Sequence, residues 1–531
     1  MFGFTKLLME RSQHPPIMFG FINPARRIRG WQRRAIYVAW AIVAFFYVAF
    51  AVLLPSPLMV LTLMPFLFLV LTVIWALPVG HYRPFRALDV LLWAFFVSQF
   101  LWPMYLAIAL PGLPWINAAR LTIIPLLFLM LIATSSCEPY RARMSEILSS
   151  LRPLWIFVTL FAVIQVLSIG FSAEPFVTVN RVFNNETAWT AVFFAAVWLF
   201  RSFHAIERWC LTFVALTVVL CFIAIAEARV EHVLWAKSIP SFLQVDDEAV
   251  GFILSGYRRL TGEYRVIATA GTPLTFAELL ALAVPFVLYL ADRNRSAGVI
   301  TLVIMADILV LNAVYLSYAR LGFVGFLLGH FLFFFYLALE HRRRHPQSLF
   351  SATMLYISPV IAGLGIAGVL LIGRLRVMVL GGQSHQYSNE ARSKQWTQGL
   401  SEIWNSPIFG FGANQGGRRL AFTNSEGKLT IDSHMLSTLL DYGFVGFLIY
   451  YGMFFYAIWR CVRLAVITEN PVTRSLSAAF AIFFAEFVII KTVLYSEINH
   501  PLVFMALGAV VALHYHERNP PAAGERATTR S

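Results

Sequence analysis

The chain has 531 residues, of which 59% are hydrophobic and 13% charged, and its mean hydropathy is +0.71. This composition leaves too little polar surface for a soluble globular protein, and the apolar runs reach the thickness of a bilayer. The formal net charge of +14 would suit nucleic acid or an anionic membrane surface. Most basic residues lie in short connectors, where membrane topology explains them, so we expect a membrane protein that contacts the lipid bilayer and no nucleic acid.

Apolar windows of about 20 residues, the length that crosses about 30 Å of hydrocarbon, follow one another along the chain. We identify fourteen windows: 35–54, 58–77, 88–110, 115–133, 154–172, 187–200, 209–226, 272–291, 297–318, 321–339, 352–373, 436–458, 476–494 and 500–515. The 187–200 window is short, and 58–77 directly follows Pro55-Ser56-Pro57. We therefore predict an all-α, polytopic transmembrane helix bundle of about 12–14 spans. Prolines inside windows predict kinks rather than breaks; they are Pro65, Pro103, Pro125, Pro285 and Pro359.

Arginines gather in alternate short connectors, which sets the predicted orientation. If the N-terminus is cytoplasmic, every basic short connector is cytoplasmic as well. The first span then acts as an uncleaved anchor, because residues 1–34 lack a cleavage signature. The predicted organisation is a cytoplasmic segment 1–34, an N-terminal bundle 35–226, an outer loop 227–271, spans in 272–373, a large outer loop 374–435, spans in 436–515 and a cytoplasmic tail 516–531.

Some basic residues are not explained by topology, because they fall in the two outer segments. Arg265 lies in the first and Arg392 in the second, and an outer basic cluster predicts an anionic ligand. Arg320 lies between two apolar windows with almost no connector. A lipid-facing arginine is costly inside the membrane, so we expect Arg320 to face the bundle or a water-filled cavity. The alternative is an arginine that extends to the membrane interface.

The second outer segment carries the densest pattern of the chain. Apolar residues between 388 and 404 recur at helical spacing, which predicts an amphipathic helix on the outer surface. Gly410 and Gly412 follow it, and we expect them to permit close approach of the backbone. His434 then precedes the run Leu439-Leu440-Asp441-Tyr442-Gly443-x-x-Gly446.

Together with Arg392 and Trp396, this pattern resembles the O-antigen ligase and polymerase superfamily of bacterial envelope glycosyltransferases. The stretches around Arg320 and from Arg265 to Glu278 are similar to two further elements of that family. The usual Asn-Pro-Asn is missing, and Met435 follows His434 where the family commonly has asparagine. The resemblance covers about residues 258–450, whereas the first 220 residues match only as generic spans.

The resemblance implies a GT-C-like enzyme of the bacterial inner membrane with its active site facing the periplasm. It would move a glycan from undecaprenyl diphosphate to a sugar hydroxyl, such as that of lipid A-core, without a cofactor or metal. A diphosphate leaving group gains charge as it departs, and guanidinium groups neutralise such charge. A histidine of near-neutral pKa suits the base. The candidates are His434 as base, Arg265, Arg320 and Arg392 for the diphosphate, and Gly410, Gly412 and Glu278 as supporting residues.

Alternatives stay open for several residues and for the function. His434 could instead belong to a helix cap with Asp432 and Ser433, and Glu278 could pair for structure alone. Lys491, Glu497 and His500 cluster in the last outer connector and could line the same cavity. A polymerase would share the reaction centre, a polysaccharide exporter would need a polar path through the bundle, and a non-catalytic scaffold would make the pattern coincidental.

Overall fold

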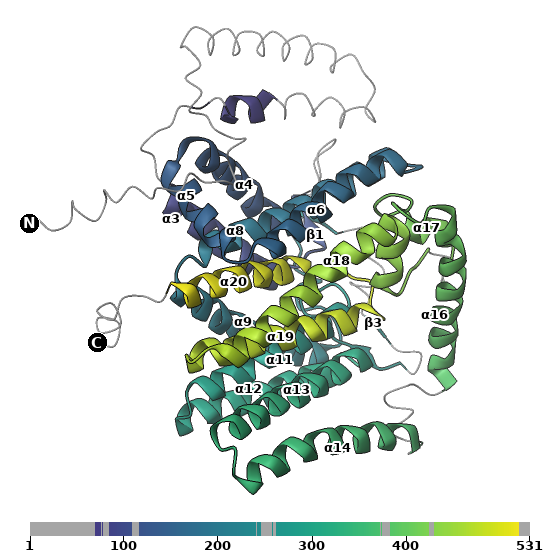
Figure 1. Cartoon of the computed structure of the whole chain (residues 1–531). Coiled ribbons are helices and arrows are strands. Elements are labelled where there is room, and N and C mark those ends of the chain that lie inside the picture. Colours follow the sequence, from purple (N-terminus) through teal and green to yellow (C-terminus); the bar gives the residue numbers. More distant parts are fainter. Residues whose placement is uncertain are drawn as a thin grey trace, which may run out of the picture.

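The structure is a computed structural model that describes residues 69–75, 77, 84–108, 116–240, 242–245, 257–258, 262–371, 373, 383–423 and 429–519. Helices dominate it (Figure 1). The helices are α3 (Phe85–Leu101), α4 (Ala118–Ser136), α5 (Glu138–Ser149), α6 (Arg152–Ser168), η3 (Ile169–Phe171), α7 (Pro175–Asn185), η4 (Glu186–Thr190), α8 (Ala191–Leu199), α9 (Phe203–Val230), α11 (Pro273–Arg293), α12 (Ala297–Leu316), α13 (Arg320–Arg344), α14 (Leu349–Leu371), α16 (Gln383–Glu402), η5 (Ile403–Asn405), α17 (Gly416–Leu420), α18 (His434–Ile467), α19 (Pro471–Lys491) and α20 (His500–Arg518).

Within the described residues, four short strands lie in the loops. Strand β1 (Leu106–Ala107) pairs antiparallel with β2 (Gln244–Val245), and β3 (Tyr257–Arg258) pairs antiparallel with β4 (Tyr264–Arg265). Each ladder has only two strands. Both therefore brace connectors between helices, and the fold class is all-α.

Eight of the described helical segments are long and apolar enough to cross a membrane. They are Ala118–Ser136, Arg152–Phe171, Phe203–Val230, Pro273–Arg293, Ala297–Leu316, Arg320–Arg344, His434–Ile467 and Pro471–Lys491. The predicted polytopic helix bundle is thus confirmed. The predicted window 35–54 and most of 58–77 lie outside the described residues.

Two windows differ in detail from the prediction. The short window at 187–200 belongs to a longer helical run, because α7, the π-helical turn η4 and α8 follow one another without a break from Pro175 to Leu199. Helix α3 ends at Leu101, so the predicted kink at Pro103 is wrong. A proline disfavours the helical conformation of the residue before it. Trp102, which precedes Pro103, accordingly has the extended angles φ −97° and ψ 125°. Pro125 and Pro285 do lie inside helices.

The helix ends that carry arginines meet on one face of the bundle, which we call the basic face. It comprises α5, the connectors α8–α9, α11–α12, α13–α14 and α18–α19, and the C-terminal end of α20, toward the left in Figure 1. Ion pairs join these ends across the bundle: Arg201–Asp89, Arg293–Glu207 and Arg474–Glu340, at 2.6, 2.7 and 3.1 Å. The predicted grouping of these connectors on one side is therefore observed.

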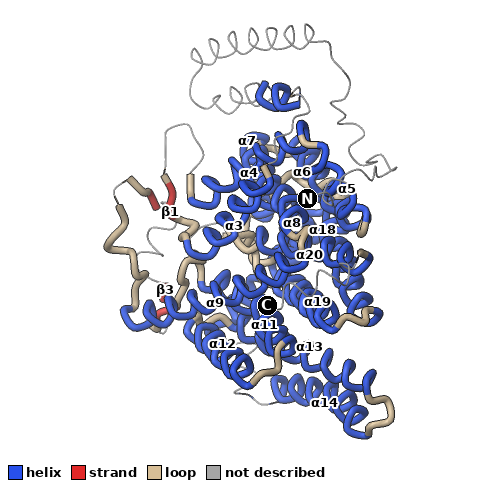
Figure 2. The backbone as a smooth tube through the Cα atoms, turned by 90° about the vertical axis from the view of Figure 1, so that its left-hand side faces the viewer, coloured by secondary structure: helices blue, strands red, loops and turns tan. Residues whose placement is uncertain are grey.

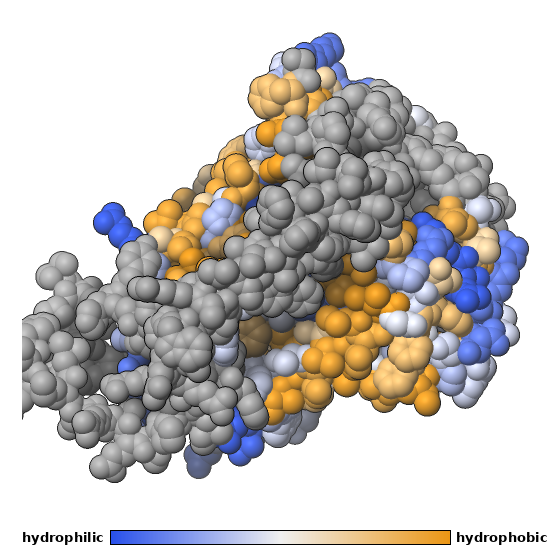
Figure 3. Space-filling view, turned by 90° about the horizontal axis from the view of Figure 1, so that it is seen from above, coloured by the Kyte–Doolittle hydropathy of each residue, from blue (hydrophilic) through white to orange (hydrophobic). Residues whose placement is uncertain are grey.

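The opposite helix ends form a second face, which we call the cavity face. Helices α16 and α17 and the first residues of α18 and α20 belong to it, toward the right in Figure 1. Viewed from above, apolar side chains cover much of the visible flank and hydrophilic residues gather at the right-hand end (Figure 3). The described part of the predicted outer segment 374–435 thus lies away from the basic face.

Helices α11 and α19 form the centre of the bundle, where aromatic side chains fill the core. Phe286 of α11 lies 5.2 Å from Phe480 of α19 and 5.6 Å from Trp209 of α9, measured between ring centroids. Small residues let α13 approach α11, because a Cβ built at Gly325 would lie 2.6 Å from the Cβ of Ala281. Helix α14 lies at the periphery (Figure 2).

Candidate active site

A cavity of about 970 Å³ opens among the helix ends of the cavity face. Its walls come from α3, the start of α4, α7 with η4, β4, the start of α11 and the connector between α19 and α20. The charged residues in its lining are Arg120, Arg181, Arg265 and Glu497. The π-helical turn η4 contributes to the wall, and such turns are frequent at functional sites.

Arg265, a predicted diphosphate ligand, lies in this cavity wall. Its Nε donates to the carbonyl oxygen of Ser317 at 3.1 Å. The backbone around Arg265 is held by the buried Glu227 carboxylate, which accepts from the hydroxyl of Tyr264 at 2.7 Å and from the amide of Ala268 at 2.8 Å. Buried charge-assisted hydrogen bonds of this kind fix geometry, so α9 orients the strand that presents Arg265.

The other two predicted arginines lie elsewhere. Arg320 is the first residue of α13 and is half-buried. It lies three residues after Ser317, whose carbonyl accepts the hydrogen bond from Arg265. Arg392 lies on α16 with its Nε 3.7 Å from Oδ2 of Asp432. Burial raises the pKa of Asp432, although Arg392 opposes that rise. Among the described residues, neither Arg320 nor Arg392 belongs to the cavity lining.

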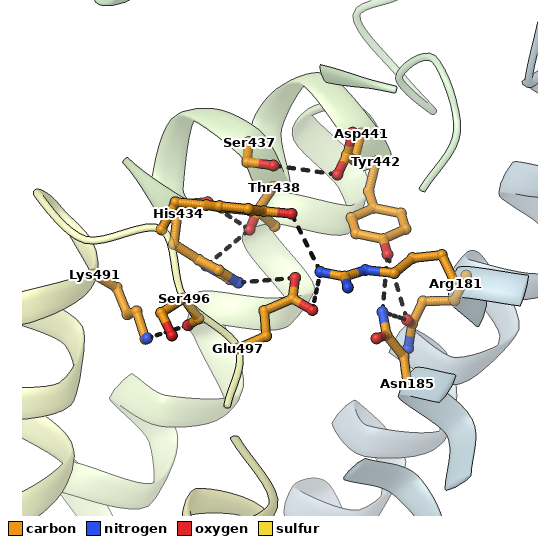
Figure 4. Close-up of polar contacts among 12 residues, drawn as sticks. Arg181, Asn185, His434, Ser437, Thr438, Asp441, Tyr442, Lys491, Ser496 and Glu497 are labelled. Carbon is orange, nitrogen blue, oxygen red and sulfur yellow. Dashed lines mark hydrogen bonds and ion pairs between the residues drawn. The ribbon is translucent and has the colours of Figure 1, made fainter. Parts of the chain in front are cut away.

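His434 is the first residue of α18, and its side chain turns into the bundle (Figure 4). Ser433 caps the helix, since its side chain accepts from the amide of Leu436 at 3.3 Å. The cap therefore does not need the imidazole. His434 Nδ1 lies 2.9 Å from the hydroxyl of Tyr451 and 3.1 Å from that of Thr438, which leaves Nε2 for another partner.

That partner is Glu497, whose Oε1 lies 3.8 Å from His434 Nε2. Arg181 contacts the same carboxylate from the opposite side and donates to the hydroxyl of Tyr495 at 3.2 Å (Figure 4). Burial alone would lower the pKa of Arg181, but Glu497 raises it above its usual value. Glu497 lines the cavity, whereas His434 is 3% exposed and lies behind it. The imidazole therefore reaches the cavity through Glu497.

Glu278, a predicted supporting residue, pairs with Lys491 at 2.6 Å, and both side chains are fully buried. Glu278 also accepts from the amide of Asn499 at 2.9 Å, and Lys491 donates to the carbonyl of Ser496 at 2.5 Å. These contacts tie α11 to both ends of the α19–α20 connector. The pair thus holds the segment that carries Glu497.

The glycine-containing loop docks into a break in α18. Gly443, with φ +66°, interrupts the helix, and the amides of Phe411 and Gly412 donate to the carbonyls of Leu440 and Asp441, each at 2.9 Å. Gly410 has φ +70°, and a Cβ there would lie 2.5 Å from the Asp441 carbonyl oxygen. Only glycine fits such an approach without displacement. The loop therefore fixes α16 and η5 against the start of α18.

Two residues of the cavity wall, Arg120 and Arg181, were missed in the sequence. Arg120 Nη2 donates to the side-chain oxygen of Asn184 at 2.9 Å. Both arginines belong to helix ends of the cavity face, so the inside-positive rule does not account for them. Their position on the side where the inside-positive rule expects no basic residues is the signal that could have identified them. In the described part of the chain, no group of three or more His, Cys, Asp or Glu side chains could hold a metal ion.

The apolar helices define a multi-pass membrane protein, and a polar cavity rich in arginine lies at one end of its bundle. Residues 305–451 match the family model described as O-antigen ligase. Over this segment the chain is similar to O-antigen ligases, membrane proteins that ligate or polymerise glycans. The match runs from α12 into α18 and includes Arg320, Arg392 and His434; Arg265 and Glu497 lie outside it. The search of curated proteins found no match.

Proposed function

We propose that the protein transfers a glycan from undecaprenyl diphosphate to a sugar hydroxyl, in the cavity described above. The cavity face would be periplasmic and the membrane the bacterial inner membrane, as the inside-positive connectors predict. One observation carries the proposal: three arginines line a single cavity whose wall also contains a glutamate backed by a histidine. The match of residues 305–451 to the O-antigen ligase model supports the reaction class.

The arginines would hold the donor diphosphate. Arg265 is the first candidate, because it lines the cavity and is anchored through Ser317 and Glu227. Guanidinium groups bind phosphate oxygens through two parallel hydrogen bonds, and they stabilise charge that grows as the carbon–oxygen bond breaks. Arg320 lies near the anchor of Arg265 and remains a candidate for the same clamp. Arg392, paired with Asp432 on α16, would act at the edge of the site.

Glu497 and His434 would together remove the proton of the acceptor. As the acceptor oxygen attacks the anomeric carbon, its proton passes to the Glu497 carboxylate at the cavity wall. The bond to the diphosphate oxygen breaks, and undecaprenyl diphosphate leaves with the electron pair. His434 Nε2, 3.8 Å behind Glu497, closes to hydrogen-bonding distance and shares the proton, which Glu497 then passes to the departing diphosphate or to water in the cavity. Such acid–base catalysis contributes about 10²–10⁴-fold.

The acceptor separates two versions of this enzyme. A ligase would use lipid A-core, whereas a polymerase would use a growing carrier-linked glycan with the same reaction centre. A null mutant should distinguish them: loss of a ligase leaves lipid A-core without long chains while carrier-linked polymer accumulates, and loss of a polymerase leaves single-repeat products. An exporter is less well supported, because the cavity lining comes from the helix ends of one face.

The decisive experiment measures glycan transfer by reconstituted protein supplied with carrier-linked glycan. We expect Arg265→Ala to lose about 10²–10³-fold in rate, the usual cost of removing one donor to developing charge. Arg265→Lys should recover part of it, because lysine supplies charge without the fork. Arg86→Ala, an exposed change near the basic face, is the control and should keep full activity, as should wild type in EDTA. Full activity of Arg265→Ala would rule out the clamp.

A further inference from the structure

A second cavity, of about 250 Å³, lies at the basic face between the ends of α18 and α20. We call it the inner pocket. Its charged and titratable lining consists of Arg460, Arg463 and Arg518, His514 and Glu517, and Ile467 supplies an apolar wall. Three arginines against one glutamate make the pocket positive. Helices α18 and α20 carry His434 and His500 at their opposite ends, so the inner pocket is a separate site.

The arginines of the inner pocket differ from their neighbours on the basic face. Arg201, Arg293 and Arg474 each contact a carboxylate of another helix. Within the described ranges, Arg460, Arg463 and Arg518 form no ion pair, although Glu517 lines the same pocket. Arg460 and Arg463 lie beside the ring of Trp459, at 5.5 and 5.9 Å from its centroid. Their charge is therefore available to an anion.

His514 provides a second, independent indication of a ligand. Its side chain is 4% exposed, and Nδ1 lies 2.9 Å from the carbonyl oxygen of Val510. Nδ1 must carry a proton to donate to a carbonyl. By strict hydrogen-bond geometry the buried Nε2 has no partner among the described residues, although the backbone of Arg460 lies beside the ring. An occupant with a hydroxyl group beside its negative charge would satisfy Nε2.

The inner pocket adjoins a lipid-facing stripe on α18. Large apolar side chains stay exposed along this helix, ending with Val466 and Ile467 at 59% and 60%. Trp459 is 51% exposed, and tryptophan favours the level of lipid headgroups. A ligand with a charged head and apolar tails could therefore place its head in the inner pocket and its tails along α18. A free anion would use only the head position.

We propose that the inner pocket binds the phosphodiester of an anionic phospholipid whose headgroup carries a hydroxyl. Arg460, Arg463 and Arg518 pair with the phosphate, the headgroup hydroxyl donates to His514 Nε2, and the acyl chains lie along α18. Basic pockets between transmembrane helices commonly bind anionic headgroups. The bound lipid would brace α18, whose other end carries His434, against α20.

The test is native mass spectrometry of the full-length protein titrated with phosphatidylglycerol or phosphatidylcholine. We expect tight retention of phosphatidylglycerol only. The double variant Arg460→Gln/Arg463→Gln should bind it about 30-fold more weakly, since each basic side chain near an anionic headgroup contributes about fivefold. Arg86→Gln/Arg152→Gln removes the same charge from exposed positions near the same face and should bind as wild type does. His514→Phe should weaken phosphatidylglycerol binding and leave phosphatidylethanol, an anionic phosphodiester without a headgroup hydroxyl, unaffected.

Three results would overturn the proposal. Equal weakening by both double variants would indicate general surface charge, and unchanged retention by Arg460→Gln/Arg463→Gln would remove the site. Thermal stabilisation by inorganic phosphate equal to that by phosphatidylglycerol, at matched ionic strength, would indicate a soluble phosphate ligand. Circular dichroism and a single symmetrical elution peak on size exclusion report correct folding of each variant, so that the lipid-binding result is independent of the proposed glycan transfer.

Discussion

The two faces of the bundle use charge in different ways. The basic face has two kinds of ion pair. Some form within one helix or its immediate continuation, such as Arg143–Glu146 and Arg295–Asp292, and others join helices, namely Arg201–Asp89, Arg293–Glu207 and Arg474–Glu340. On the cavity face, the ion pairs join separate helices or connectors: Arg181–Glu497, Arg392–Asp432 and Lys491–Glu278. Local pairs add little to the assembly of a bundle, whereas the pairs of the cavity face fix its helix ends and connectors against one another.

The position of each arginine bears on which of them we propose as ligand-binding residues. Arginines at cytoplasmic helix ends satisfy a topology rule and stay near water. Arg120, Arg181 and Arg265 lie at the opposite helix ends and line a cavity, where the topology rule provides no reason for them. Position relative to the membrane, more than the number of arginines, is therefore the reason to propose a binding role for these three residues; on the basic face, the proposal for Arg460, Arg463 and Arg518 rests on their shared pocket instead.

Replacement of His434 should have the largest effect on the cavity face. His434→Ala should reduce the transfer rate about 10²–10⁴-fold without loss of expression or donor binding. His434→Asn and His434→Ser should be equally inactive, because neither accepts the proton effectively. The measurement is single-turnover transfer by purified protein across a range of pH. His204→Ala, which changes a histidine with 60% side-chain exposure on the basic face, should behave as wild type.

The His434 series also separates chemistry from structure. Ser433 caps α18, so helix stability should not depend on residue 434. Restored transfer in the Asn and Ser variants would assign His434 a structural role, and the base would then be sought in Glu497 alone. Glu497→Gln keeps the shape of the side chain and should be as impaired as His434→Ala if the two act as one unit.

Removal of one partner of the buried pair Glu278–Lys491 should mainly affect stability. Lys491→Met leaves an uncompensated carboxylate at 0% exposure, a situation that costs about 3–5 kcal/mol. The double variant Glu278→Gln/Lys491→Met should regain much of that loss, because no unpaired charge remains. Thermal unfolding in detergent tests this expectation. A single variant as stable as wild type would mean that the pair does not hold the α19–α20 connector.

The sequence predicted the bundle well because bilayer-length apolar runs are local signals. The amphipathic helix predicted at 388–404 corresponds to α16, and Asn405 ends η5 as expected. The face of α16 that packs against the protein is not the predicted apolar face. Ala391, Gln395 and Gly399 are buried, whereas Trp404 is 71% exposed. Small residues let α16 approach α18 closely, which hydrophobic spacing alone does not reveal.

The site was predictable only where its residues form a motif. His434 and Arg265 stand in recognisable segments, but the Arg181–Glu497 contact joins positions more than half the chain apart. No local pattern encodes such a pair, because helix packing alone brings α7 beside the last connector. The break at Gly443 is similar: its glycine is visible in the sequence, but the loop that fills the break is not.

The smallest effect is expected from a local pair of the basic face. Arg295 Nη2 lies 2.7 Å from Asp292 Oδ1, and the arginine side chain is 66% exposed. Exposed pairs contribute about 0.2–1 kcal/mol and are screened by salt. A double-mutant cycle with Asp292→Ala and Arg295→Ala, followed by thermal unfolding, should give a coupling within that range that shrinks at high ionic strength. A coupling as large as that of Glu278–Lys491, insensitive to salt, would contradict the contrast between the faces, because local pairs would then stabilise the bundle as strongly as those that join its helices.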